Sequence, residues 1–302
     1  MTSKLFTPTK EESTQFKSPS PLLSVWGWEI RRVFENPLNW AFTLASFLFF
    51  LAMMWFKHAW NMGTDTGSQF TLYGTSAIGL LYEFTVVLMF VFAFMLPFVV
   101  TEGIARDYKK RMHEVIMATS LSTPAYVWGR FLAVLSIAFG QALLMLLAGL
   151  VMGSILHLRN DAYPQPLLSN LIIVWALIVI PPMILITGIG FSLGTFWPRR
   201  TRLIMLGILI AWILLFTLGS ILRLNPTGSS IVVSIIPQLM QKANASLASL
   251  PLDQRAAWVQ QLQANLPDVG GWIIPQYGLA AAGILLVGIT TAGFRRFRNE
   301  LN

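Results

Sequence analysis

The sequence predicts an all-α integral membrane protein with six transmembrane helices, an N-terminal interfacial helix and both termini in the cytoplasm. Three observations carry this prediction. Hydrophobic residues make up 55% of the 302 residues, and the mean hydropathy is +0.64, which is outside the range of soluble globular proteins. Six apolar segments are each about as long as a helix that crosses the hydrocarbon core of a bilayer. Basic residues gather in alternate connections between these segments.

The N-terminal part of the chain contains two elements ahead of the first span. Residues 1–20 are rich in Ser, Thr, Pro and Lys and lack the apolar core of a secretory signal, so we expect a flexible cytoplasmic tail. Residues 21–37, PLLSVWGWEIRRVFENP, predict an amphipathic helix at the membrane interface. Asn36-Pro37 cannot continue this helix and separates it from the first span.

The transmembrane domain is expected within residues 38–302. Its six spans are predicted near residues 38–56, 78–100, 127–156, 168–197, 203–222 and 272–294. Ser122-Thr123-Pro124, a hydroxyl residue followed by proline, predicts the start of the third helix. Pro181-Pro182 predicts a bend or an unwound turn in the middle of the fourth.

The distribution of Lys and Arg predicts the orientation. Sixteen of the twenty-one lie in the N-terminal tail and approach helix, the second-to-third connection and its exit into the third span, the fourth-to-fifth connection, and the C-terminus. The other five are Lys57, Arg159, Arg223, Lys242 and Arg255. Because cytoplasmic loops carry the excess of basic residues, the sixteen mark the cytoplasmic side. The same bias explains the net charge of +8 without nucleic-acid binding, for which the sequence offers no basic patch with interleaved aromatics.

The segment Thr101–Pro124, TEGIARDYKKRMHEVIMATSLSTP, holds seven charged residues, although only 11% of the chain is charged. On a helix, opposite charges would meet at i,i+4 spacing in three pairs, which are Glu102 with Arg106, Asp107 with Arg111, and Lys110 with Glu114. One interpretation is a set of basic anchors at the membrane rim. The other is a docking surface for a partner protein, which mixed charges suit better than a lipid surface.

This region also carries a family resemblance. The order IARDYKKRMHEVIMATSLSTPAYVWGRFLAV resembles permease subunits of ATP-binding-cassette type-2 transporters, in which a mixed-charge helix precedes a Ser/Thr-Pro turn and a Gly-Lys or Gly-Arg pair. The matching positions are Arg106-Asp107, Glu114, Ser122-Thr123-Pro124 and Gly129-Arg130. The six-span plan, the approach helix, the loop WPRRTR and the long outer segment 223–271 are similar as well, so the resemblance covers nearly the whole chain. Met112-His113 departs from the small or hydroxyl residue of many members.

The resemblance implies a prokaryotic exporter subunit in the cell (inner) membrane. Loop 101–126 would be a coupling helix seated in a separate ATPase, with two ATPases and a second permease copy or homologue in the working unit. The implied coupling interface comprises Arg106, Asp107, Lys110, Arg111, His113 and Glu114, with Arg199, Arg200 and Arg202 as a second contact. ATP and Mg²⁺ would bind the ATPase and no cofactor this chain, which agrees with the lack of a G-x-x-x-x-G-K-[ST] motif.

Four positions within the spans are candidates for a transport pathway or a hinge. Glu83 is an acidic residue inside a span, where such residues are costly, although snorkelling to water or pairing with an outer-loop base explains it more simply. Gln141 needs a hydrogen-bonding neighbour or a wet pathway. Pro181 and Pro182 favour either a hinge or a structural kink.

Other patterns carry less specific information. Gly149-x-x-x-Gly153 and Gly190-x-x-x-Gly194 favour internal helix packing over a dimer face. The segment LDQRAAWVQQLQANLP, capped by Asp253, predicts a short external helix that is either a lid or a surface cap.

The sequence offers no enzyme chemistry of its own. It contains no cysteine, which excludes disulfides and thiolate chemistry, and its three histidines show no metal-ligand spacing. A non-transporting scaffold or assembly subunit is the alternative to a permease, and a membrane enzyme of another type is a third hypothesis.

Overall fold

The structure is a computed structural model that describes most of the chain. The described residues are 20–56, 59–63, 69–94, 96, 121–161, 163–222, 237–238, 241–243, 245–266 and 268–299. The tail before residue 20, residues 101–120 of the expected coupling loop and parts of the outer segment 223–271 lie outside them.

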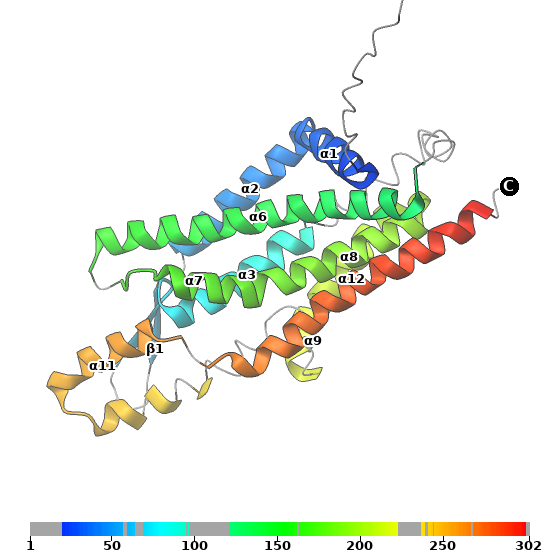
Figure 1. The fold of residues 1–302 in the computed structure, drawn as a ribbon. Coiled ribbons are helices and arrows are strands. Elements are labelled where there is room, and N and C mark those ends of the chain that lie inside the picture. The colour runs from blue at the N-terminus through cyan, green and yellow to red at the C-terminus, as the bar shows by residue number, and fades with distance from the viewer. Residues whose placement is uncertain are drawn as a thin grey trace, which may run out of the picture.

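Helices dominate the described residues (Figure 1). They are α1 (Pro21–Phe34), α2 (Pro37–Phe56), α3 (Ala77–Phe94), α6 (Thr123–Arg159), α7 (Leu168–Val174), α8 (Ile180–Phe196), α9 (Thr201–Leu222), α11 (Leu252–Ala264) and α12 (Gly270–Asn299). A π-helical turn, Trp175–Val179, continues α7 into α8, and a 3-10 turn, Pro198–Arg200, joins α8 to α9. Two strands, β1 (Ala59–Gly63) and β2 (Gln69–Tyr73), connect α2 to α3.

Four helical segments of the described chain are long and apolar enough to cross a membrane. They are Asn39–Phe56, Thr123–Arg159, Leu168–Phe196 and Gly270–Phe294, and they coincide with the first, third, fourth and sixth predicted spans. The chain is therefore a multi-pass membrane protein. The second and fifth predicted spans coincide with α3 and α9, which are helical but are not among these four.

Helix α6 has two apolar faces of different kinds. One face is buried in the bundle, and the other carries exposed large apolar side chains at every fourth position, which are Phe139, Leu143, Leu147, Val151 and Ile155. In water such a stripe would be unfavourable. Against lipid tails it is the expected outer surface, so the pattern agrees with a membrane environment.

The elbow between α1 and α2 forms where the sequence predicts a break. Helix α1 ends at Phe34, and Pro37 begins α2 because proline is tolerated in a first turn but not in a helix interior. Side chains of α2 then bond the last carbonyls of α1: the Asn39 amide donates to Val33 O at 3.1 Å, and the Trp40 indole donates to Phe34 O at 2.8 Å. These two bonds hold the elbow closed.

The hairpin is an addition to the expected all-helical architecture. Strands β1 and β2 pair antiparallel, with Ala59 opposite Tyr73 and Gly63 opposite Gln69. The β2 sequence QFTLY alternates polar with aromatic or aliphatic residues and contains a β-branched threonine, as strands commonly do. The spans predicted near residues 38–56 and 78–100 leave this segment as the connection between them.

One serine ties the hairpin to α3. Ser76 Oγ accepts a hydrogen bond from Gly79 N at 3.0 Å, which caps the helix, and donates to Tyr73 O at 2.6 Å. The Tyr73 ring packs edge-on against Tyr163 with ring centroids 4.7 Å apart. Burial raises the pKa of the Tyr163 phenol, and the neighbouring Tyr73 raises it further.

The long helices run between two ends of the molecule, which we call the α1 end and the hairpin end. At the α1 end, Tyr126 in the first turn of α6 packs against Phe294 of α12, with ring centroids 6.0 Å apart. A Cβ added to Gly293 would lie 2.9 Å from the ring of Phe196, the last residue of α8. The start of α6 and the ends of α8 and α12 therefore gather at the α1 end, where α9 also begins.

The ends of α2, α6 and α11 and the start of α7 lie at the hairpin end. The Arg159 guanidinium, at the end of α6, lies 5.0 Å from the Trp55 ring near the end of α2. The Asn170 amide, near the start of α7, donates to Ala264 O at the end of α11 at 2.9 Å. Thus α2 and α6 run toward the hairpin end, and α3 and α7–α8 run back from it (Figure 1).

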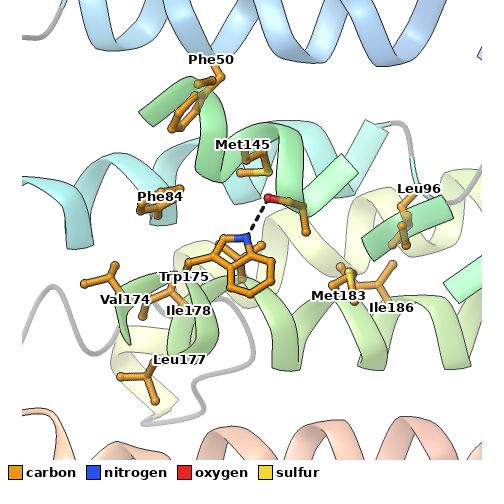
Figure 2. Packing of buried hydrophobic residues seen from close by; sticks show 14 of the residues in the cluster. Phe50, Phe84, Leu96, Met145, Val174, Trp175, Leu177, Ile178, Met183 and Ile186 are labelled. Atoms are coloured by element: carbon orange, nitrogen blue, oxygen red, sulfur yellow. Dashed lines mark hydrogen bonds between the residues drawn. The ribbon is translucent and has the colours of Figure 1, made fainter. Parts of the chain in front are cut away.

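The core is centred on the π-helical turn. Figure 2 shows Trp175 pointing toward α6, where its indole donates to Ala142 O at 2.7 Å. Ile180 N bonds Trp175 O, five residues earlier, which widens the helix by one residue. Pro181 and Pro182 follow in the first turn of α8 and cannot donate to the carbonyls four residues before them. The sequence predicted a bend or an unwound turn, and the structure places a π-helical turn there.

Helices α8 and α12 approach each other through glycines. A Cβ added to Gly188 would overlap the carbonyl oxygen of Gly283, and a Cβ on Gly283 would lie 2.8 Å from Ile184 O. Backbones can come this close only where neither helix has a side chain, which is how membrane helices pack without a hydrophobic driving force between them.

The predicted small-residue motifs serve internal packing, the interpretation that the sequence favoured. A Cβ on Gly149 would contact Leu171 and Phe84 at 3.3 and 3.4 Å, and one on Gly153 would lie 2.8 Å from Pro166. Gly190 and Gly194 are buried in α8.

Two expected helix caps need correction. Helix α6 begins at the predicted place, with Ser122 as the N-cap residue, but the Ser122 hydroxyl makes no capping bond. Helix α11 forms as predicted, but Pro251, not Asp253, precedes its first residue. Asp253 lies inside the first turn, where its charge still favours the helix dipole.

We expect Gly188→Ala to destabilise the bundle by about 1–3 kcal/mol, because the new methyl group must separate α8 from α12. The measurement is the midpoint of thermal unfolding of the purified protein in detergent. Gly288→Ala is the control, since it adds the same methyl group to α12 where nothing lies within 4 Å. Equal effects of the two substitutions would contradict the glycine contact.

Candidate functional site

A buried ion pair joins α1 to α6 at the α1 end. Arg130 Nη2 of α6 lies 3.4 Å from Glu29 Oε2 of α1, and the two side chains are 1% and 5% exposed. Glu29 is the one buried residue of α1. A carboxylate at this depth is stable only with a hydrogen-bonded cation beside it, so the contact determines where α1 lies on α6.

A second guanidinium and two aromatic rings complete this cluster. Arg32 Nη1 lies 3.4 Å from the same Glu29 oxygen. The Arg130 guanidinium lies 4.8 Å from the centre of the Tyr126 ring and 5.9 Å from that of Trp28, and Arg32 lies 5.1 Å from Trp28. Cations over aromatic faces gain electrostatic stabilisation, and more so when water is excluded. We call Trp28, Glu29, Arg32, Tyr126 and Arg130 the α1–α6 charge cluster.

Close backbone packing brings the cluster together. A Cβ on Gly129 would lie 2.9 Å from Leu22 O and 2.9 Å from Val25 Cβ, so α1 can reach α6 only because this position is glycine. About two turns further along α6, the Trp26 indole donates to Ser136 Oγ at 3.1 Å. The Gly129-Arg130 pair therefore has a structural explanation: the glycine admits α1, and the arginine holds its carboxylate.

The two α6 residues of the cluster, Tyr126 and Arg130, come shortly after the charged loop in the chain. Residues 101–120 end two residues before the start of α6 at Thr123, and Tyr126 and Arg130 occupy the first two turns. Because a helix is stiff along its axis, a displacement of the loop end would move Arg130 and, through Glu29, α1 and the elbow. The arrangement can therefore transmit a movement of the loop end through α6 to α1.

The sequence-predicted interface residues are only partly placed. Arg106, Asp107, Lys110, Arg111, His113 and Glu114 lie outside the described residues. Arg199 and Arg200 are exposed in the short connection between α8 and α9, and Arg202 is exposed in the first turn of α9, at the same end of the molecule as the charge cluster. The structure thus puts this basic connection and the start of α6 at one end.

Glu83 requires a correction. Snorkelling to water or pairing with an outer-loop base was expected, and the first does not hold, because Glu83 is completely buried, with 0% of its surface exposed. The physical reason is that α3 is surrounded by α7, the π-helical turn, α9 and α11, which cover the turns that the sequence placed near a membrane surface. Pairing of Glu83 with a basic residue of the outer segments stays a prediction.

The other three predicted positions, Gln141, Pro181 and Pro182, lie around one contact between α6 and the π-helical turn. Gln141 is 5% exposed, and its neighbour Ala142 accepts the hydrogen bond from Trp175. Pro181 and Pro182 are buried at the start of α8, one turn beyond that bond. Gln141 and the proline pair therefore flank the same contact between α6 and the π-helical turn.

Sequence reasoning missed Glu29, Trp28 and Tyr126. The available signal was Glu29, an acidic residue close to Arg31 and Arg32 on the aromatic-rich approach helix. It does not identify the partner, because Arg130 is 101 residues away in the chain. Among the described residues, no three His, Asp or Glu side chains lie close enough together to hold a metal ion.

No model of a known protein family matches the chain, and no curated protein was found to match it.

We expect Arg130→Met to lower the free energy of unfolding by about 1–3 kcal/mol, because it removes the fully buried one of the two guanidinium groups on Glu29 and leaves Arg32, which is 19% exposed. Adding Glu29→Leu to Arg130→Met should recover much of this loss, since an apolar pair can replace a buried ion pair. Both effects are measured as shifts of the thermal unfolding midpoint in detergent.

The control for these variants is Arg31→Gln, which removes an exposed ion pair of the same helix, Arg31 with Glu35. Exposed pairs contribute little, so its midpoint should stay near that of the unsubstituted protein. Glu29→Leu alone is measured as well. If the losses of Glu29→Leu and Arg130→Met simply add in the double variant, the residues do not act as a pair.

Proposed function

We propose that the chain is the membrane-spanning permease subunit of an ATP-driven transporter of the ATP-binding-cassette type. In this proposal the chain binds no nucleotide, and a separate ATPase docks on the cytoplasmic loop 101–126. The α1–α6 charge cluster is the observation that carries the proposal, because it connects the helix that follows this loop to the rest of the bundle.

The arrangement of the helices supports six spans. Four helical segments are long and apolar enough to cross a membrane, and α3 and α9 lie among them as further apolar helices. Six crossings leave both termini on one side, which agrees with the side predicted from the Lys and Arg distribution. That side is the α1 end, and it faces the cytoplasm.

The charge distribution supports a docking surface at this end. Arg199, Arg200 and Arg202 are exposed there, at the same end as the start of α6, the helix that follows the mixed-charge loop in the chain. Complementary charges steer partners and fix their orientation. A cytoplasmic ATPase would therefore contact the loop as its main site and the α8–α9 connection as a second.

The coupling step follows from the contacts of α6. Closure of the ATPases pulls or pushes the loop, and α6 moves with it as a stiff rod. Arg130 and Glu29 pass this movement to α1 and, through the elbow, to α2. The hydrogen bond from Trp175 to Ala142 passes it to the π-helical turn, where a wide turn followed by two prolines offers a place for α7 and α8 to bend.

The proposed orientation predicts opposite labelling of two single-cysteine variants. The chain has no native cysteine, so Arg200→Cys and Asp161→Cys each carry one thiol, and both positions are exposed. A membrane-impermeant maleimide added to intact cells should label Asp161→Cys and leave Arg200→Cys unlabelled until the cells are opened. Labelling of both from outside would contradict the orientation.

Docking of the ATPase is tested by charge reversal in the loop. The affinity-tagged chain, purified from its native membranes, should bring with it a protein that hydrolyses ATP. Asp107→Lys with Glu114→Lys should reduce the recovered ATPase activity by about tenfold or more, because like charges across an interface cost several kcal/mol.

The matched control is Asp161→Lys with Asp253→Lys, which changes the net charge equally on the opposite side and should leave the activity unchanged. Purification without any ATP-hydrolysing partner would refute the permease function and favour a scaffold subunit. Unchanged activity in the loop variant would refute the docking site alone.

A further inference from the structure

A cavity of about 260 Å³ lies under the elbow between α1, α2 and α6. Its walls are mostly apolar, and its lining residues are Ile30, Val33, Phe34, Asn39, Trp40, Thr43, Ser136, Ile137, Gly140, Gln141 and Leu144. Because the elbow is held closed by the bonds of Asn39 and Trp40 to α1, the cavity is formed before any ligand binds.

Gln141 is the polar group in this wall that needs a partner. Within the described residues, its Oε1 is buried and accepts no hydrogen bond. The hydroxyl groups of the lining are satisfied, since Thr43 donates to Asn39 O at 2.8 Å and Ser136 donates to Leu132 O at 2.7 Å. A buried amide oxygen without a donor is costly, so a ligand with an N–H or O–H group would gain a hydrogen bond here.

The cavity lies where membrane lipids are the available ligands. Its walls include the first two turns of α2 and the middle of α6, and both helices are long and apolar enough to span a membrane. Two of the lining residues are exposed apolar side chains, with Phe34 55% and Trp40 54% exposed. The start of a span is at the level of the lipid headgroups, where a tryptophan such as Trp40 is favoured.

We propose that this cavity binds a membrane phospholipid whose headgroup carries a hydrogen-bond donor. One acyl chain lies along the apolar wall near Ile137 and Leu144, and the headgroup donates to Gln141 Oε1. At about 260 Å³ the cavity is smaller than most pockets for whole ligands, so it holds part of the lipid while the remainder stays in the bilayer. This inference depends on the membrane placement of α2 and α6 and is independent of ATPase docking.

Gly140 offers a way to fill the cavity without disturbing the fold. It lines the cavity, and a Cβ added there meets nothing within 4 Å. A phenylalanine at this position would therefore project into the space of the acyl chain. Gly207 on α9 is the matched control, because it is also an exposed helical glycine with nothing within 4 Å and does not line the cavity.

The experiment uses phosphatidylethanolamine with a photoreactive diazirine on one acyl chain. The full-length protein is placed in nanodiscs of phosphatidylcholine containing this probe, irradiated, digested and analysed by mass spectrometry. We expect crosslinks in the peptides that contain Trp40 and Ile137–Leu144. Unlabelled phosphatidylethanolamine or phosphatidylglycerol, which have headgroup donors, should compete about three- to tenfold better than phosphatidylcholine, which has none.

Two variants separate the parts of the proposal. Gly140→Phe should reduce crosslinking in these peptides by about tenfold, and Gly207→Phe should leave it unchanged. Gln141→Leu should keep the crosslinks but abolish the preference for donor-bearing lipids. Crosslinking that survives Gly140→Phe, or equal competition by phosphatidylcholine in the unsubstituted protein, would overturn the proposal. Gln141→Leu gives an independent result if Gly140→Phe fails to fold.

Discussion

The buried contact between Glu29 and Arg130 is the constraint on which the arrangement of the first half of the molecule depends. A carboxylate that is 5% exposed needs its cation in place, so α1 has one position along α6 rather than a range of sliding positions. Gly129 permits the approach, and the elbow bonds from Asn39 and Trp40 then fix the start of α2. The cavity between α1, α2 and α6 is a consequence of this geometry, because it is the space left under a rigid elbow.

The second half of the molecule is held by packing of a different kind. Helices α8 and α12 meet through glycine backbones around Gly188 and Gly283, which gives close contact without polar groups. Between this pair and α6 lies the π-helical turn, whose widened helix is anchored by one hydrogen bond from Trp175. A glycine-packed pair resists deformation, whereas a π-helical turn followed by two prolines is a local weakness. The bundle therefore combines a rigid pair with one segment suited to bending.

A rigid helix pair and a segment suited to bending are what a membrane subunit needs if a separate protein drives its movement. The proposed driving point is the charged loop before α6, and α6 is the helix that contacts both the charge cluster and the π-helical turn. In that scheme α1 is a lever at the headgroup level rather than a passive anchor, since its buried residue is a charge held by α6. A lipid seated under the elbow would contact α1, α2 and α6 at once and would stabilise one arrangement of the lever.

The sequence by itself determined the positions of the long helices, because apolar length and proline breaks are local properties of the chain. It also marked Gln141, Pro181 and Pro182, which are unusual residue types for a span. It could not determine that Glu29 meets Arg130, that Gly188 faces Gly283, or that Glu83 is fully enclosed. Those facts depend on which helix faces lie together, and contacts between residues about a hundred positions apart leave no periodic signal in a single sequence. The sequence did not predict the β1–β2 hairpin for a related reason, since a short strand is stable only beside its partner.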